Sequence, residues 1–183
     1  IGKYYYNTRQ EATVTIDNSA AVASKETVYS KNFYVPTPQQ AFTIGLDYRS
    51  PQFWFITANF NYFDKMYLSM NPIRRTANAV DGVTEGSELW HQIIDQTKLK
   101  SQYTVDLFGG YSWLMNRKFH NLKKRTFLVF NVGVNNILNN QKIVSGGFEQ
   151  LRFDFAGKNV NKFPERRFYA YGINYFASVG IRF

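Results

Sequence analysis

The side chains able to carry out acid–base or metal chemistry are few and scattered. The two histidines, His91 and His120, are far apart in the sequence and lack the neighbouring carboxylates of a metal or catalytic site. Asp47 and Asp106 fall on the polar rows of alternating segments, where a water-filled interior would solvate them. Because the chain has no cysteine, it has no thiol nucleophile, disulfide or Cys-bound zinc site. We therefore expect no enzyme activity, no metal site and no cofactor.

Aromatic and basic side chains are the groups that the sequence has in excess. Aromatic residues make up 18% of the chain, which suits the interfacial girdles of a membrane sheet but also a surface that binds carbohydrate or nucleic acid. The net charge is +9, yet the basic residues are spread over turns and loops, which argues against a nucleic-acid partner. Their densest group comprises Arg117, Lys118, Lys123, Lys124 and Arg125. This group is either a solvated turn or a contact for anionic lipid head groups.

The elements that must position these side chains are strands, and the clearest covers residues 173–183. Alternate residues there form one apolar row, from Ile173 to Phe183, and one row of mostly small or polar side chains. About ten alternating residues are enough for a tilted strand to cross a bilayer. The same pattern recurs at residues 42–49, 53–62, 103–113 and 128–135. Residues 4–16 are the expected first strand, although part of it is polar on both faces. We expect the following apolar side chains to face lipid: Phe42, Ile44, Leu46, Trp54, Ile56, Phe60, Val105, Leu107, Phe130, Val132 and Val134.

The connections between these strands alternate in length. Residues 17–40, 66–99 and 139–172 form long connections, whereas 49–52 and 117–125 are short. In a meander this puts every long loop at one end of the sheet, as in outer-membrane barrels, where short turns are periplasmic and long loops extracellular. The carboxyl terminus is then periplasmic. Within the second long connection, Ser87 is the expected N-cap of a short helix.

The long connections also contain aromatic side chains that are candidates for ligand or partner contacts. Such residues either stack on sugars or on a partner lipoprotein, or pack the loops against one another. They are Trp90, Phe148, Phe153, Tyr169 and Tyr171.

Six strands are too few to close a barrel with a usable interior, and open edges are not tolerated in hydrocarbon. Either residues 28–35 and 148–155 add two strands to a small barrel, or further strands come from outside this sequence. The chain opens strand-like, without an initiating Met or a signal peptide, so we expect a fragment of a larger barrel. Two alternatives are a soluble β-sandwich binding module with loops at both ends and a small self-closing outer-membrane barrel.

Several stretches resemble one family of membrane proteins. Residues 131–140 (NVGVNNILNN) resemble the penultimate strand of TonB-dependent outer-membrane receptors, and residues 34–64 resemble a preceding hairpin. Residues 145–150, Phe163-Pro164, 169–176 and 179–183 continue the match. The nearest variety resembles the SusC-like receptors that bear a carboxypeptidase-regulatory domain. One departure is Ser178, where the family pattern has Gly.

The resemblance implies an all-β, antiparallel, 22-stranded transmembrane barrel closed by an amino-terminal plug. Residues 1–183 would supply the last six or so strands, and the plug would lie outside them. Implied partners are the remaining strands and plug, the TonB system, outer-membrane lipids and a surface lipoprotein. The implied activity is uptake of a scarce glycan, peptide or metal chelate. The residues that match the barrel-assembly signal are Tyr175, Val179, Ile181 and Phe183.

Overall fold

The computed structural model describes residues 1–16 and 20–183, and strands dominate this part of the chain. Their bounds are β1 Glu11–Thr15, β2 Val22–Thr27, β3 Gln40–Arg49, β4 Trp54–Asp64, β5 Gln102–Leu114, β6 Phe127–Asn135, β7 Val144–Phe148, β8 Arg166–Tyr169 and β9 Asn174–Arg182. Helical structure comprises α1 Glu88–Ile94 and three short 3-10 turns, η1 Ile73–Arg75, η2 Asn78–Val80 and η3 Met115–Arg117. All strand pairs given a register are antiparallel, so the fold is all-β.

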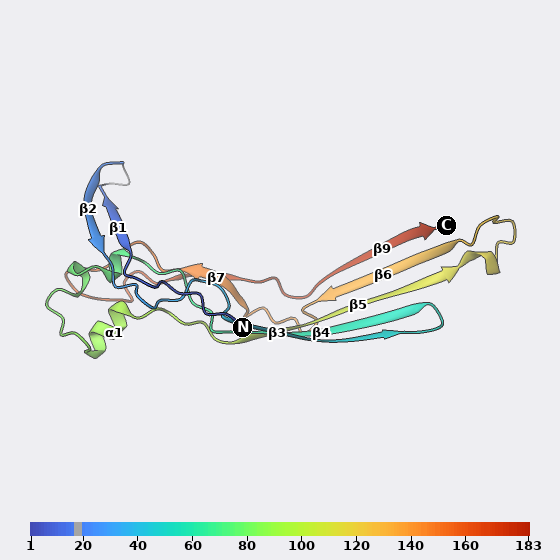
Figure 1. The fold of residues 1–183 in the computed structure, drawn as a ribbon, viewed down its shortest axis with the longest axis horizontal. Helices are drawn as coiled ribbons and strands as arrows, with labels where there is room; N and C mark the ends of the chain where they lie inside the picture. Colours follow the sequence, from blue (N-terminus) through green and yellow to red (C-terminus); the bar gives the residue numbers. More distant parts are fainter. Residues whose placement is uncertain (17–19) are drawn as a thin grey trace. The chain divides into compact units, whose positions relative to one another are not determined.

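The chain forms two compact units, each built from three segments. The first unit contains residues 1–40, 64–101 and 144–169, and the second contains residues 41–63, 102–143 and 170–183. The second unit is the five-stranded sheet in the order β3-β4-β5-β6-β9, which Figure 1 shows with β3 and β9 as its edges. Among the described strands, β3 and β9 each have a neighbour on one side only, so this sheet is open.

The register of the five-stranded sheet is continuous over β4, β5, β6 and β9. Val132 of β6 lies opposite Gly109 of β5 and Ala177 of β9, and the pairs on both sides follow without a shift. Because side chains alternate along a strand, this register collects one row from each strand on the same face. The expected strands at 42–49, 103–113, 128–135 and 173–183 are confirmed to within one or two residues.

The connections within this sheet alternate in length as predicted. β3–β4 and β5–β6 are joined by short turns, and the long connections 65–101 and 136–173 join strands at the opposite end of the sheet. The β3–β4 turn is closed by the Ser50 amide, which donates to the Trp54 carbonyl at 2.8 Å. The expected start of the third strand at Phe53 is wrong, because Phe53 lies in this turn with φ of +64°.

The first predicted strand, residues 4–16, is largely wrong. Only Glu11–Thr15 is a strand, and it pairs with β2 in a two-stranded sheet of the first unit rather than with β3. The residues before it are bound irregularly: the Tyr6 amide donates to the Phe33 carbonyl and the Gln10 amide to the Ser30 hydroxyl. The predicted loop over residues 17–40 is wrong in part, because β2 lies within it; residues 17–19 of this loop lie outside the described residues.

The two segments proposed as extra barrel strands do not provide them. Within residues 28–35, Tyr34 makes one isolated bridge with Tyr5, and no strand forms. Within residues 148–155, only Phe148 belongs to a strand, at the end of β7. β7 pairs with β8 in a second two-stranded sheet of the first unit.

The first unit has a small hydrophobic core of its own. Ala79, Val80, Ile93, Ile94 and Phe153 are buried together, and α1 supplies two of them from one face. The predicted helix is confirmed: the Ser87 hydroxyl accepts a hydrogen bond from the Trp90 amide at 3.2 Å. A capped helix of two turns therefore holds the long 65–101 connection to this core.

Candidate functional site

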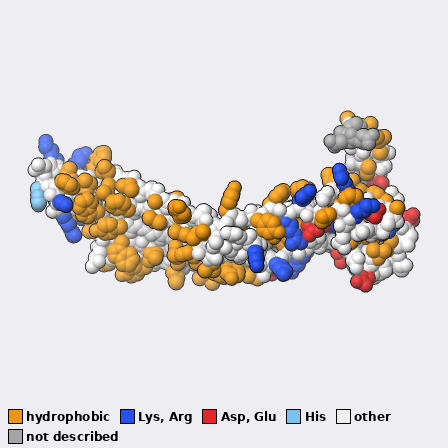
Figure 2. Space-filling model, turned by 180° about the vertical axis from the view of Figure 1, so that it is seen from behind, with side chains coloured by type: hydrophobic (Ala, Val, Ile, Leu, Met, Phe, Trp, Pro, Cys, Tyr) orange, Lys and Arg blue, Asp and Glu red, His pale blue; other side chains and the backbone are white. Residues whose placement is uncertain are grey.

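The predicted lipid-facing residues of β3, β4, β5 and β6 lie on one face of the five-stranded sheet. The register pairs Phe60 with Val105 and Leu107 with Val134 on that face, and the Phe42 and Tyr62 rings, 6.5 Å apart, join β3 to it. No member of this set is buried: Leu46 is 75% exposed, and Val105, Leu107 and Val134 are half-buried by their neighbours. We call this surface the apolar face (orange over the sheet in Figure 2).

The predicted assembly-signal residues extend the apolar face onto β9. Tyr175 lies opposite Val134, Val179 opposite Phe130, and Ile181 opposite Leu128. All three are more than 60% exposed, as is Phe183. The terminal strand thus presents a continuous apolar row at an open edge of the sheet.

The opposite face of the sheet is cross-linked by polar side chains. The Thr57 hydroxyl donates to Asp47 Oδ1 at 2.6 Å, and Asn61 Nδ2 donates to Asp106 Oδ2 at 2.7 Å. Asp106 Oδ1 also accepts from the Asn136 amide at 2.8 Å. Both aspartates therefore belong to hydrogen-bond networks between strands. Charged groups held in this way fit a hydrated surface better than a packed core.

Aromatic rings also occupy this second face, which the sequence predicts to be mostly small or polar. Phe108 lies between Phe55 and Phe176, with ring centroids 5.4 and 6.0 Å away. Phe176 lies directly against Gly133, where the methyl group of an alanine would overlap the ring. Gly133 is therefore required because it leaves room for the ring of the neighbouring strand. The second face is amphipathic, with a ring cluster beside the polar network.

The five aromatic residues predicted to lie in ligand-binding loops have different surroundings. Phe153 is buried in the core of the first unit, and Trp90 packs against that core. Trp90 also meets the Tyr29 ring edge-on at 6.0 Å. These two residues pack the loops, whereas Phe148, Tyr169 and Tyr171 remain exposed.

A buried ion pair in the first unit has no counterpart in the sequence predictions. Arg75 and Glu149 are 0% and 4% exposed, and Arg75 Nη2 donates to Glu149 Oε1 at 2.8 Å. Arg75 Nη1 donates to Glu149 Oε2, which also accepts from the Asn71 amide at 2.9 Å. The guanidinium additionally donates to the carbonyls of Asn71, Ile94 and Asp95.

Every polar group of this pair is thus satisfied, which compensates for its burial. The pair joins the segments around residues 71–75, 94–95 and 149, which are far apart in the sequence. Its spacing of 74 residues and its lack of a motif explain why sequence inspection misses it. We interpret it as the clamp that orders the long connections.

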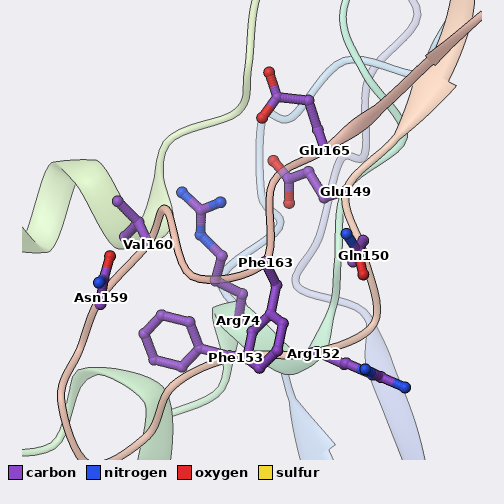
Figure 3. A pocket seen from close by; sticks show the side chains of 9 residues that line it. All are labelled: Arg74, Glu149, Gln150, Arg152, Phe153, Asn159, Val160, Phe163 and Glu165. Atoms are coloured by element: carbon purple, nitrogen blue, oxygen red, sulfur yellow. The ribbon is translucent and has the colours of Figure 1, made fainter.

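A small pocket lies beside this clamp, shown in Figure 3. Its lining includes Arg74, Phe153, Phe163 and the carboxylates of Glu149 and Glu165. Burial and the neighbouring Arg75 lower the pKa of Arg74, although both carboxylates oppose the shift. Arg74 donates to the carbonyls of Gln92 and Ile93. Its guanidinium is therefore already bound to the backbone of α1.

Two carboxylates near this pocket have ion-pair partners that stabilise their charge. Hydrogen bonds from Lys162 and the Gly157 amide lower the pKa of Asp154, which lies 3.1 Å from Lys162 Nζ. A hydrogen bond from Arg167 likewise lowers the pKa of Glu165. Both groups stay ionised at neutral pH, so neither is poised for proton transfer.

No catalytic or metal-binding arrangement involves the histidines. His91 lies 3.3 Å from Asp95 on one exposed helix face, and His120 is exposed in the β5–β6 turn. Within residues 1–16 and 20–183, no group of three or more His, Cys, Asp or Glu side chains is suitable to hold a metal ion. In the same part of the chain, no helix has the length and apolar character needed to span a membrane.

Comparisons of this chain with protein-family models, curated proteins and solved structures found no match.

Proposed function

We propose that this chain forms the carboxyl-terminal part of the barrel wall of a TonB-dependent outer-membrane transporter. In this proposal the apolar face contacts lipid and the hydrogen-bonded face borders the lumen. The long connections face the cell exterior, and the short turns face the periplasm. The chain has no catalytic role and contributes to active uptake of a scarce glycan, peptide or metal chelate.

The observation that carries the proposal is the separation of the two faces of the sheet. One face exposes a row of large apolar side chains from every strand, and the other carries inter-strand networks around Asp47 and Asp106. Soluble proteins rarely expose apolar patches of such extent. A lipid-facing exterior and a wet interior explain both faces at once.

The strand dimensions and edges support a membrane barrel rather than a sandwich. β3, β4 and β5 have 10, 11 and 13 residues, enough for a tilted strand to cross a bilayer. A sandwich requires a second sheet over the apolar face. Within the described residues, however, the members of that face remain exposed or half-buried. The open edges at β3 and β9 suit further strands of a larger barrel, since five strands cannot close around a lumen.

The partners follow from the same proposal. The edges of the sheet pair with the other strands of a 22-stranded barrel, and the lumen face borders an amino-terminal plug through which the TonB system acts. Outer-membrane lipids cover the apolar face. The exposed rings of Phe148, Tyr169 and Tyr171 are available to a ligand or a surface lipoprotein. Nucleic acid has no part in this function.

The proposal is tested by labelling two neighbouring positions of β9 in the membrane. The chain contains no cysteine, so Val179→Cys and Ser178→Cys each introduce a single thiol. These residues are adjacent and point to opposite faces of the sheet, which makes each the control for the other. We expect Ser178→Cys to react with a water-soluble maleimide. We expect Val179→Cys to react only after the protein is unfolded, because a thiol surrounded by hydrocarbon does not form the reactive thiolate. Equal reaction of both thiols with the water-soluble reagent would refute the proposed lipid face.

The transporter claim needs a second measurement, the mass of the membrane-extracted protein with and without boiling. We expect a compact species that is much heavier than the 21.3 kDa of this chain. This species should unfold only on boiling. A compact species close to 21.3 kDa would mean that the chain closes by itself, and the transport proposal would then be wrong.

A further inference from the structure

The connection between β5 and β6 concentrates positive charge at the short-turn end of the sheet. We call this connection, residues 115–126, the basic turn. Its five cations are Arg117, Lys118, Lys123, Lys124 and Arg125. All five are exposed, and the sequence has no carboxylate side chain between Asp106 and Glu149. Among the described residues, none of the five forms an ion pair. Figure 2 shows Lys and Arg side chains at this end of the sheet, beyond the apolar face.

Hydrogen bonds give the basic turn a defined shape. Asn116 Nδ2 donates to the carbonyls of Leu122 and Lys124 at 3.2 and 2.9 Å, and Asn116 Oδ1 accepts from the Thr126 amide at 2.7 Å. The Met115 carbonyl accepts from the amides of Lys118 and Phe119. The backbone of the turn is therefore bridged internally, which keeps the five cations close together.

Aromatic side chains adjoin the basic turn on the side of the sheet. A groove between the two short turns is lined by Phe53, Trp54, Tyr111, Trp113 and Arg117, among others. Phe119, within the basic turn, is 47% exposed and meets the Trp113 ring edge-on at 6.3 Å. Trp and Tyr prefer the boundary between hydrocarbon and head groups. Cations directly beyond such rings are at the depth of lipid phosphates.

Nearby carboxylates do not neutralise this end of the sheet. Asp47, on β3, is bound by Arg49 at 3.0 Å and by the Thr57 hydroxyl at 2.6 Å. Asp106 lies toward the other end of the sheet, where it is bound by Asn61 and by the Asn136 amide. The positive charge of the basic turn is therefore unbalanced, and its complement is an anionic surface.

We propose that the basic turn and the adjoining aromatic groove bind acidic phospholipid head groups in the leaflet at the short-turn end of the sheet. This inference rests on the proposed membrane function, because it needs the apolar face to be in lipid. The cations attract the phosphate, and the rings cover the glycerol and upper acyl region. A nucleic-acid ligand fits less well, because the groove runs into an apolar face that bases and phosphates would leave uncovered.

The test compares lipid retention by the intact protein and two charge variants. The protein is equilibrated in vesicles of equal phosphatidylglycerol and phosphatidylcholine, extracted, and analysed for bound lipid by native mass spectrometry. The turn variant carries Arg117→Gln, Lys118→Gln, Lys123→Gln and Lys124→Gln. The matched control removes four exposed cations elsewhere, with Lys31→Gln, Lys98→Gln, Lys100→Gln and Lys142→Gln.

We expect the unmodified protein and the control to retain about ten-fold more phosphatidylglycerol than phosphatidylcholine, and the turn variant less than about two-fold. This drop of about five-fold is the contribution of one cation near an anionic surface, so it is the least that removing four cations should cause. The preference should also fall in the unmodified protein as salt rises, which tests the inference if the turn variant does not fold. A salt-independent preference would overturn it. So would equal loss in the control variant.

Two competing ligands are tested in the same samples. Millimolar inorganic phosphate should leave the lipid preference intact, and its loss would mean that the turn binds free anions instead. A labelled single-stranded oligonucleotide should not bind, and binding that the turn variant abolishes would reassign the surface to nucleic acid. An inserted protein with no lipid preference would refute this inference but leave the barrel proposal standing. A protein recovered in the aqueous phase without detergent would refute the barrel proposal itself.

Discussion

The effect of Val132→Arg on stability distinguishes an apolar face that contacts lipid from one that contacts water. Val132 is 51% exposed near the middle of β6, and its neighbours across the sheet are Gly109 and Ala177. These small neighbours leave room for a long side chain, so the cost of the substitution reports the medium outside rather than a clash. Near the midplane of a bilayer we expect a loss of about 2–4 kcal/mol in the free energy of unfolding. On a surface in water the change would be within about 0.5 kcal/mol.

The matched control is Ser178→Arg on the opposite face. It removes one hydrogen bond, 3.3 Å long, from Asn131 Nδ2 to the Ser178 hydroxyl, worth about 0.5–1.5 kcal/mol. Ile181→Arg adds a depth control, because this residue lies on the apolar face near the end of β9 and should cost only about 0–1 kcal/mol. The two faces should thus differ by about 0.5–3.5 kcal/mol.

The assay is urea unfolding of the protein in lipid vesicles, followed by tryptophan fluorescence. The predicted order of destabilisation is Val132→Arg first, with Ser178→Arg and Ile181→Arg well below it. If Val132→Arg costs no more than Ser178→Arg, the apolar face does not contact lipid, and the reasoning from exposure and alternation is wrong.

Three further predictions concern packing and charge. Glu149→Gln should destabilise the first unit by about 3–5 kcal/mol in thermal unfolding, because it leaves Arg75 buried without its counter-charge; replacing both by apolar residues should recover most of the loss. Gly133→Ala should lower the free energy of unfolding by about 1–3 kcal/mol, because the new methyl group displaces the Phe176 ring. In a protein that already carries Phe176→Ala, Gly133→Ala should have almost no effect on the free energy of unfolding. The hydrogen-exchange protection factors of residues 154–162, which are exchange rates corrected for the intrinsic effect of pH, should be constant above about pH 4 and fall below it. The contribution of ionised Asp154, whose pKa is held below its ordinary 3.8, is lost as pH falls through the lowered value.

Each of these predictions has a clear contrary result. An unchanged melting temperature for Glu149→Gln would mean that the clamp does not hold the long connections. Additive effects of Gly133→Ala and Phe176→Ala would show that the ring and the glycine are independent. Equal protection factors at pH 3 and pH 5 would show that the Asp154 carboxylate does not order its turn.

Local patterns in the sequence determined the faces and ends of the main strands. The alternation around Val132 and Val179 needs only the two-residue period of a strand, so the composition of each apolar row can be read before any pairing is known. Ser87 predicted the start of α1 for a similar reason, since an N-cap acts on the next few amides. Features with a range of a few residues were therefore predictable.

Pairing between distant segments was decided only by the tertiary structure. Residues 4–16 alternate well enough to suggest a strand of the main sheet. In the structure, β1 instead pairs with β2, the next strand along the chain. Phe53 fits the period of β4 yet lies in the turn, where a positive φ ends the alternation. A periodic pattern specifies what a strand shows to each side, but not which strand lies beside it.

The clamp between Arg75 and Glu149 is the feature that was least predictable from the sequence. In the sequence these are two charged residues in polar loops, where exposure is the ordinary expectation. Only the folded chain brings them together with the carbonyls of Ile94 and Asp95, and those bonds make their burial tolerable. The sequence by itself determined the two-faced strands, because their period is local. The buried charges and the open five-stranded sheet depended on contacts between residues far apart in the chain.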